Sequence, residues 1–209
     1  MRLLAIVFLI FATACSRQGD KSFAGRWKKN IKNIVYQDEA VQTHWKNARV
    51  PIVKLLDSLH INTRDVRIVI RKSAYELGVY KDTILLKNYP VVFGGNPVDD
   101  KLMQGDNCTP EGVFKIRTKY PHAKWSRFIW IDYPNADSWK KHNAAVARGV
   151  IPKNSDIGGE VGIHGIPQGY DEAIDLRQNW TLGCISMKNR DVIDLYPVVH
   201  KDILIEIRK

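Results

Sequence analysis

The sequence predicts a mainly β, α+β domain built on a mixed β-sheet sandwich, with a helical segment ahead of it. Short segments from residue 66 onward alternate apolar and polar residues, which is the period of a strand with one buried face. Few helical patterns interrupt them, and many short strands with one or two helices are typical of such a domain. The chain has 209 residues, enough for one sizeable domain and a small appendage.

The predicted elements follow one another in a simple order. Residues 34–61 carry apolar side chains at three- and four-residue steps, which predicts a helical lead-in that Pro51 should kink or interrupt. The main domain is then expected over residues 62–209. Its predicted strands are 66–72, 75–80, 83–95, 112–120, 127–133, 161–165, 183–187 and 202–207. Helices are expected at 136–149 and at 189–200, where Pro197 should bend or end the second one.

The first residues have the pattern of an export signal. Met1 and Arg2 precede about ten uncharged residues, a run too short to span a bilayer, so residues 1–14 are expected to be a signal peptide. The following Ala-Thr-Ala-Cys resembles a bacterial lipobox, which implies lipidation of Cys15 and a tether over 15–33. A simple exported protein and a retained anchor are the alternatives. The domain is expected to work outside the cytoplasm, lipid-anchored to a membrane that faces the periplasm or cell wall.

Composition excludes several classes of protein. Hydrophobic residues make up 44% and charged residues 26%, which excludes a wholly disordered chain and a polytopic membrane protein. The net charge of +10 favours an anionic partner or surface, but it is dispersed, so nucleic acid is not an expected partner. Neither a phosphate-binding G-x-x-x-x-G-K-[ST] loop nor an H-E-x-x-H or C-x-x-C pattern occurs, so no cofactor and no metal are expected.

A cysteine and a histidine near the C-terminus could form a nucleophilic site. Cys184 follows Gly183, and His164 lies 20 residues upstream, before Gly165. A free thiol with a pKa near 8.5 is mostly protonated at neutral pH, and an imidazole within hydrogen-bond reach can take that proton. Gly183 would let an acyl donor approach the sulfur. The residues alone equally allow two buried side chains on adjacent strands with no catalytic role.

Two segments resemble the signature of the L,D-transpeptidase catalytic family (the YkuD-type domain), and most closely its YafK-like branch. His164-Gly165 followed by TLGCISMKN at 181–189 is similar to the family's catalytic motif. GDNCTPEGVFKI at 105–116 is similar to its Gly-Asp-x-x-Thr-Pro-x-Gly-x-Phe segment. The resemblance covers about residues 66–209. It implies a peptidoglycan enzyme of cell-wall biogenesis and cell shape that attacks stem peptides through a cysteine thioester.

The resemblance also assigns roles to individual residues. It implies Cys184 as nucleophile, His164 as base, and the carbonyl of Gly165 as the group that orients the imidazole. The N–H of Cys184, helped by Gly183, would form the oxyanion hole. Thr181 is expected to brace the turn. Asn189 is expected to brace the turn or contact substrate, and Arg177 and Trp180 are candidates for shaping the donor pocket.

The chain departs from the family pattern at three positions. Many members carry His or Arg where Leu182 stands and Arg where Ser186 stands, so the donor peptide is not determined. Cys108 occupies a place where no cysteine is expected and should be a free or partly buried thiol.

Two other functions remain open: a cysteine hydrolase on the same scaffold (an L,D-carboxypeptidase, or an amidase that releases wall-linked protein) and a wall-binding module without catalysis. Trp125 is expected in the core or along a glycan groove.

Overall fold

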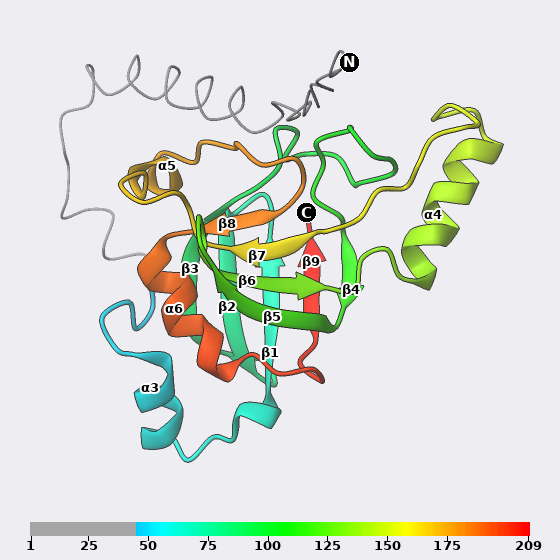
Figure 1. Cartoon of the computed structure of the whole chain (residues 1–209). Coiled ribbons are helices and arrows are strands. Elements are labelled where there is room, and N and C mark those ends of the chain that lie inside the picture. The colour runs from blue at the N-terminus through cyan, green and yellow to red at the C-terminus, as the bar shows by residue number, and fades with distance from the viewer. Residues whose placement is uncertain (1–44) are drawn as a thin grey trace, which may run out of the picture. The chain divides into compact units, whose positions relative to one another are not determined.

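A computed structural model describes residues 45–209 of the chain (Figure 1). The predicted signal peptide, Cys15, the tether over 15–33 and the first part of the helical lead-in all lie outside the described residues. Among the residues that are described, no helix is both long enough and apolar enough to cross a membrane.

The secondary structure is dominated by short strands. The α-helices are α3 (Ile52–Ser58), α4 (Ala136–Ala147), α5 (Glu172–Asp175) and α6 (Asn189–Leu195), with 3₁₀ turns η2 (Thr63–Asp65) and η3 (Tyr196–Val198). The strands are β1 (Val66–Arg71), β2 (Glu76–Lys81), β3 (Ile84–Val92), β4 (Gly112–Phe114), β5 (Ile116–His122), β6 (Ser126–Ile131), β7 (Gly162–His164), β8 (Ile185–Met187) and β9 (Ile205–Arg208). The prediction of a mainly β, mixed-sheet domain is confirmed.

All the strands of the described chain belong to one mixed sheet. Their order is β4-β9-β1-β2-β3-β8-β7-β6-β5. The β1–β9 and β7–β8 pairs are parallel, and the other neighbours are antiparallel. The parallel β7–β8 pair lies within the second half of the sheet, and it joins two short segments that are about twenty residues apart in sequence.

The sheet curls until its two ends nearly meet. β4 and β5 are the two edge strands, yet only Lys115 separates them in the chain. One residue spans less than about 4 Å, so the edges must lie close together. Lys115 also exchanges hydrogen bonds with Asp132, at 2.9 Å in each direction. The sandwich is therefore a nearly closed, barrel-like sheet whose halves face each other across one core (Figure 1).

The core follows from the alternation of apolar residues. Ile68 and Ile70 of β1 are fully buried, as are Ile163 of β7 and Ile185 of β8. Helices α3 and α6 close the core with the side chains Ile52, Leu56, Val192 and Leu195. Burying a side chain of this size contributes roughly 1.5–3 kcal/mol, so the core supplies most of the free energy that holds the curled sheet.

Several predicted elements differ in detail from the observed ones. The segment 112–120, expected as one strand, is two strands on opposite edges, because Lys115 carries the chain from one edge to the other. The last strand begins at Ile205 rather than at 202. The helix α5 was not predicted, since four residues leave no periodic pattern. As expected, the final helix ends before Pro197 and continues as η3.

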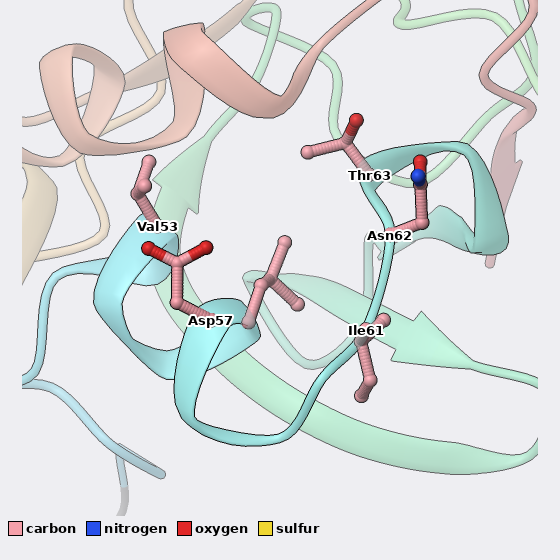
Figure 2. Close-up of a pocket in the computed structure, with 6 residues that line it drawn as sticks. Val53, Asp57, Ile61, Asn62 and Thr63 are labelled. Atoms are coloured by element: carbon pink, nitrogen blue, oxygen red, sulfur yellow. The ribbon is translucent and has the colours of Figure 1, made fainter.

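One carboxylate joins three separate elements of this fold. Asp194 of α6 accepts hydrogen bonds from Lys87 Nζ at 2.7 Å, from the Tyr89 hydroxyl at 2.8 Å and from the Ile52 backbone N–H at 2.9 Å. Lys87 is buried, so its charge depends on this partner. A hollow lies between α3 and η2 (Figure 2). It is lined by Val53, Leu56, Asp57, Ile61, Asn62 and Thr63.

We predict that Asp194→Ala destabilises the fold strongly. Removing the carboxylate leaves a buried lysine charge without its partner, which costs about 3–5 kcal/mol in comparable pairs. Urea unfolding followed by circular dichroism measures the loss. Asp57→Ala is the control, because Asp57 is exposed and surface changes usually stay within about 0.5 kcal/mol. Equal unfolding midpoints for the two variants would contradict the role assigned to Asp194.

Candidate functional site

The parallel pairing of β7 with β8 brings the predicted nucleophile and base onto one face of the sheet. The register pairs His164 with Ser186 and Ile163 with Ile185. Side chains alternate between faces, so Ile163 and Ile185 enter the core while His164 and Ser186 point to the other side. Continuing the register by one residue places Cys184 on that same face, diagonal to His164 and beside Gly162.

Cys184 sits at the end of a tight turn that its neighbours hold in place. Thr181 Oγ1 accepts a hydrogen bond from the Gly183 N–H at 3.2 Å and donates one to the Cys184 carbonyl at 2.7 Å. Gly183 has a φ of 141°, and a Cβ there would lie 2.7 Å from the Cys108 carbonyl oxygen. Glycine is therefore required, and the Gly183 N–H expected in the oxyanion hole is engaged within the turn.

The imidazole of His164 has a defined orientation. Its Nδ1 lies 2.6 Å from the carbonyl oxygen of Gly165. A carbonyl only accepts, so Nδ1 carries the proton and Nε2 of the neutral ring is left as the acceptor. Ser186 Oγ donates to the same carbonyl at 3.3 Å. A Cβ on Gly165 would collide with Asn189 Oδ1 and with the Trp125 carbonyl, so this position also requires glycine.

Aromatic rings enclose the imidazole. Trp125 stacks on it with ring centroids 4.5 Å apart, and Phe128 lies nearly parallel at 5.7 Å. Trp180 meets it edge to face at 5.6 Å. Behind Trp125, His122 stacks at 4.3 Å and accepts hydrogen bonds through Nδ1 from the Lys124 and Trp125 backbones. His164 is consequently only 2% exposed.

Burial keeps both candidate groups uncharged. It lowers the pKa of His164 to about 4, helped by nearby His122 and opposed by the hydrogen bond to Gly165. Burial likewise raises the pKa of the Cys184 thiol to about 11, against a backbone hydrogen bond from Gly162 and the positive charge of Lys101. At neutral pH Cys184 is therefore a thiol and His164 a neutral imidazole.

The remaining predicted residues lie around this pair, but not all point at it. Asn189 Oδ1 accepts from the Ile166 N–H at 3.2 Å and Nδ2 donates to the Ile166 carbonyl at 2.8 Å, so its side chain braces the chain after His164. Arg177 lies with its guanidinium over the Tyr75 ring, 5.1 Å from the centroid. Trp180 touches the imidazole directly. A substrate contact by any of them stays a prediction.

The departures from the family pattern have clear positions. Leu182 is 81% exposed, two residues before Cys184, and Ser186 is fully buried on the Gly165 carbonyl, where a longer side chain would not fit without displacing its neighbours. Cys108 is a free, buried thiol, as expected, and burial raises its pKa to about 11. Within the described residues no three His, Cys, Asp or Glu side chains gather to hold a metal ion.

The sequence analysis missed two side chains at the site. Lys101 is a buried lysine whose ammonium lies near Gly183, and no local pattern marks it. Trp125 was expected in the core or on a glycan groove, but it stacks on His164 from the β5–β6 turn and its carbonyl accepts the Gly165 N–H at 3.0 Å. Both act on the site across long sequence distances, which only the fold reveals.

Comparison with known proteins identifies the family. Residues 65–207 match the family model of the L,D-transpeptidase catalytic domain, and the chain belongs to this family. No curated protein matches the chain.

Several solved structures resemble this chain at low sequence identity. The helical cell shape determining protein Pgp2 from Campylobacter jejuni superposes with a TM-score of 0.52 at 20% identity, covering 75% of this chain and 55% of Pgp2. Bd1075 from Bdellovibrio bacteriovorus has a TM-score of 0.48 at 18% identity, with 69% and 48% covered. An Enterococcus faecium L,D-transpeptidase C442S mutant has a TM-score of 0.46 at 17% identity, with 69% and 50% covered. The chain thus spans about half the length of these proteins.

We predict that Trp125→Ala raises the pKa of His164 from about 4 toward the ordinary value of about 6.5. Loss of the indole lets water reach the imidazolium, which burial otherwise disfavours. An NMR titration of the imidazole resonances measures the change. Trp139→Ala is the matched control, since Trp139 lies edge-on against His142 instead. An unchanged His164 pKa in the Trp125 variant would contradict the assigned cause.

Proposed function

We propose that the protein is a peptidoglycan L,D-transpeptidase that forms an acyl-thioester on Cys184 with a stem peptide and transfers the acyl group to an amine acceptor. The observation that carries the proposal is the geometry of His164. The His164 Nδ1–H is donated to the Gly165 carbonyl, and the His164 side chain lies on the same face of the sheet as Cys184. This leaves Nε2 as the proton acceptor, which is the arrangement of a base oriented by a third group.

The chemistry proceeds in two acyl transfers. Cys184 Sγ attacks the carbonyl at the bond that joins an L-configured centre to a terminal D-amino acid, while His164 Nε2 takes the thiol proton. The Cys184 N–H stabilises the oxyanion. Collapse of the tetrahedral intermediate breaks the C–N bond, and the imidazolium returns the proton to the leaving amine. An acceptor amine then attacks the thioester and gives a proton to His164. The C–S bond breaks, and the imidazolium returns this proton to the Cys184 sulfur.

The neutral resting pair suits this mechanism. A buried thiolate-imidazolium pair would have to be desolvated without substrate, whereas the neutral pair keeps both groups uncharged until attack. The proton moves as the sulfur–carbon bond forms, so charge passes to the oxyanion instead of remaining on sulfur. The Gly165 carbonyl and the face of Trp125 both favour the imidazolium that forms transiently.

The proposed substrate rests on the family, and the proposed location rests on the predicted signal peptide. Membership in the L,D-transpeptidase catalytic family supports peptidoglycan stem peptides as donors. The similarity in fold to a cell shape determining protein is consistent with a role in wall architecture. We propose that export and a lipid on Cys15 hold the domain next to the wall, facing the periplasm, through the tether at 15–33.

We predict that Cys184→Ala abolishes turnover of stem tetrapeptides, because the thioester cannot form, with activity falling at least about 10³-fold. The wild-type protein should also gain a covalent adduct from a carbapenem-type β-lactam at Cys184, read by mass spectrometry. Cys108→Ser is the matched control and should keep both properties, since the Cys108 thiol is buried and donates to the Asp106 carbonyl. Residual turnover in the Cys184 variant would overturn the thiol mechanism.

The acceptor distinguishes a transpeptidase from a hydrolase on the same scaffold. With stem peptide as donor and a D-amino acid as amine acceptor, we expect the exchanged or cross-linked peptide to exceed the hydrolysed tripeptide. Separation of the products by liquid chromatography with and without the amine measures this ratio. If only hydrolysed product forms at saturating amine, the protein is instead an L,D-carboxypeptidase.

A further inference from the structure

A buried ammonium group lies beside the nucleophile turn. The side chain of Lys101 is only 4% exposed. Its Nζ donates to Asp106 Oδ1 at 2.8 Å and to the Met103 carbonyl at 3.0 Å. The same Nζ lies 3.8 Å from the position that a Cβ on Gly183 would occupy. A fixed positive charge therefore faces the glycine that precedes Cys184.

The position of this charge is held by the loop between β3 and β4. Asp106 accepts from the backbone N–H groups of Leu102, Met103 and Cys108 as well as from Lys101. Burial alone would raise the pKa of Asp106, but these hydrogen bonds outweigh it and lower the pKa, so the carboxylate is charged. Asp106 and Lys101 thus form a fixed ion pair whose ammonium end lies towards Gly183.

The turn before Cys184 offers fewer free N–H groups to an oxyanion than the sequence suggests. The Gly183 N–H is donated to Thr181 Oγ1, so it does not point freely at a developing oxyanion. Gly183 has no side chain to separate Lys101 from the reacting centre. A cation in a dry site is worth far more to a developing negative charge than one in water.

We infer that Lys101, acting across Gly183, stabilises the negative charge that Cys184 carries as its thiol loses the proton and attacks. This role rests on the proposed function of Cys184 as the nucleophile. The charged groups that act on the thiol are Lys101, which lowers its pKa, and Glu160, which raises it, while His164 is neutral. Glu160 also places its carbonyl 3.5 Å from Sγ.

Alkylation of Cys184 by iodoacetamide tests the inference without any stem peptide. Only the thiolate reacts, so the rate reports charge stabilisation at sulfur. Lys101→Met should slow alkylation at pH 8 by about three- to tenfold and move the pH profile upward, because an opposite charge nearby favours the thiolate. Mass spectrometry of the peptide that contains Cys184 separates it from the other cysteines.

Lys87→Met is the matched control. Lys87 is as buried as Lys101, at 3% side-chain exposure, and is paired to Asp194 at 2.7 Å, but it lies away from the nucleophile turn. The control should keep the wild-type alkylation profile, and Lys101→Arg should keep most of it by retaining the charge. If Lys101→Met and Lys87→Met give the same profile, the inference is wrong and Lys101 only supports its loop.

A second measurement uses only the wild-type protein, so it does not depend on whether a variant folds. The quantity measured is the ratio of the alkylation rate with iodoacetate to the rate with iodoacetamide. In the wild-type protein this ratio should be higher for Cys184 than for glutathione, because the carboxylate of iodoacetate is attracted by the buried ammonium of Lys101. A ratio at or below that of glutathione would overturn the inference. Since neither reagent is a substrate analogue, this outcome is independent of whether Cys184→Ala loses peptide turnover, which alone decides the proposed function.

Discussion

The candidate site depends on the parallel pairing of two very short strands, β7 and β8. Each contributes three residues, yet their register decides which side chains share a face. A shift of one residue would send His164 into the core and Ile163 to the site. The apolar residues Ile163, Ile185 and Met187 prevent this shift, because all three are fully buried on the opposite face. Packing of the apolar side chains on the core face of β7 and β8 therefore positions the candidate site on the opposite face.

Glycine allows the backbone to approach closely around the two reactive groups. Gly162 lets the Phe128 ring lie against His164, and Gly165 lets the Trp125 carbonyl and the Asn189 amide close on the chain after the imidazole. Gly94 similarly lies against the backbone of Asn107 and Gly183. A Cβ at any of these glycines would disturb the close contact, so these glycines allow the chain segments around the site to pack closely.

The loop that carries Lys101 is fixed by the long insertion that contains α4. His142 Nδ1 donates to the Leu102 carbonyl at 2.7 Å, and the Gln104 N–H donates to the Asp156 carbonyl at 2.7 Å. Lys141 pairs with Asp100 and donates to the Glu111 carbonyl. The insertion thus supports one wall of the site from outside the sheet, and its last residues before β7 bring the Glu160 carbonyl to the sulfur.

The strand-rich class and most strand positions could be predicted from the sequence because they depend on local alternation. The assignment of Cys184 and His164 as a catalytic pair came from a motif of a few residues and stays a prediction. The sequence could not determine that 112–120 divides between the two edges of the sheet, since that requires knowing where the edges meet. It also could not bring Lys101 and Trp125 to the site, because Lys101 lies 82 residues before Gly183 and Trp125 lies 39 residues before His164.

Tertiary structure alone decided the charge state of the site. The motif predicts a thiol and an imidazole that could share a proton, but their pKa values depend on burial, which the residues of the motif do not specify. The Gly183 N–H was expected to help form the oxyanion hole. It instead donates a hydrogen bond to Thr181 Oγ1 within the turn. Motif residues establish which groups can react, and the surrounding packing establishes how much water and charge they meet.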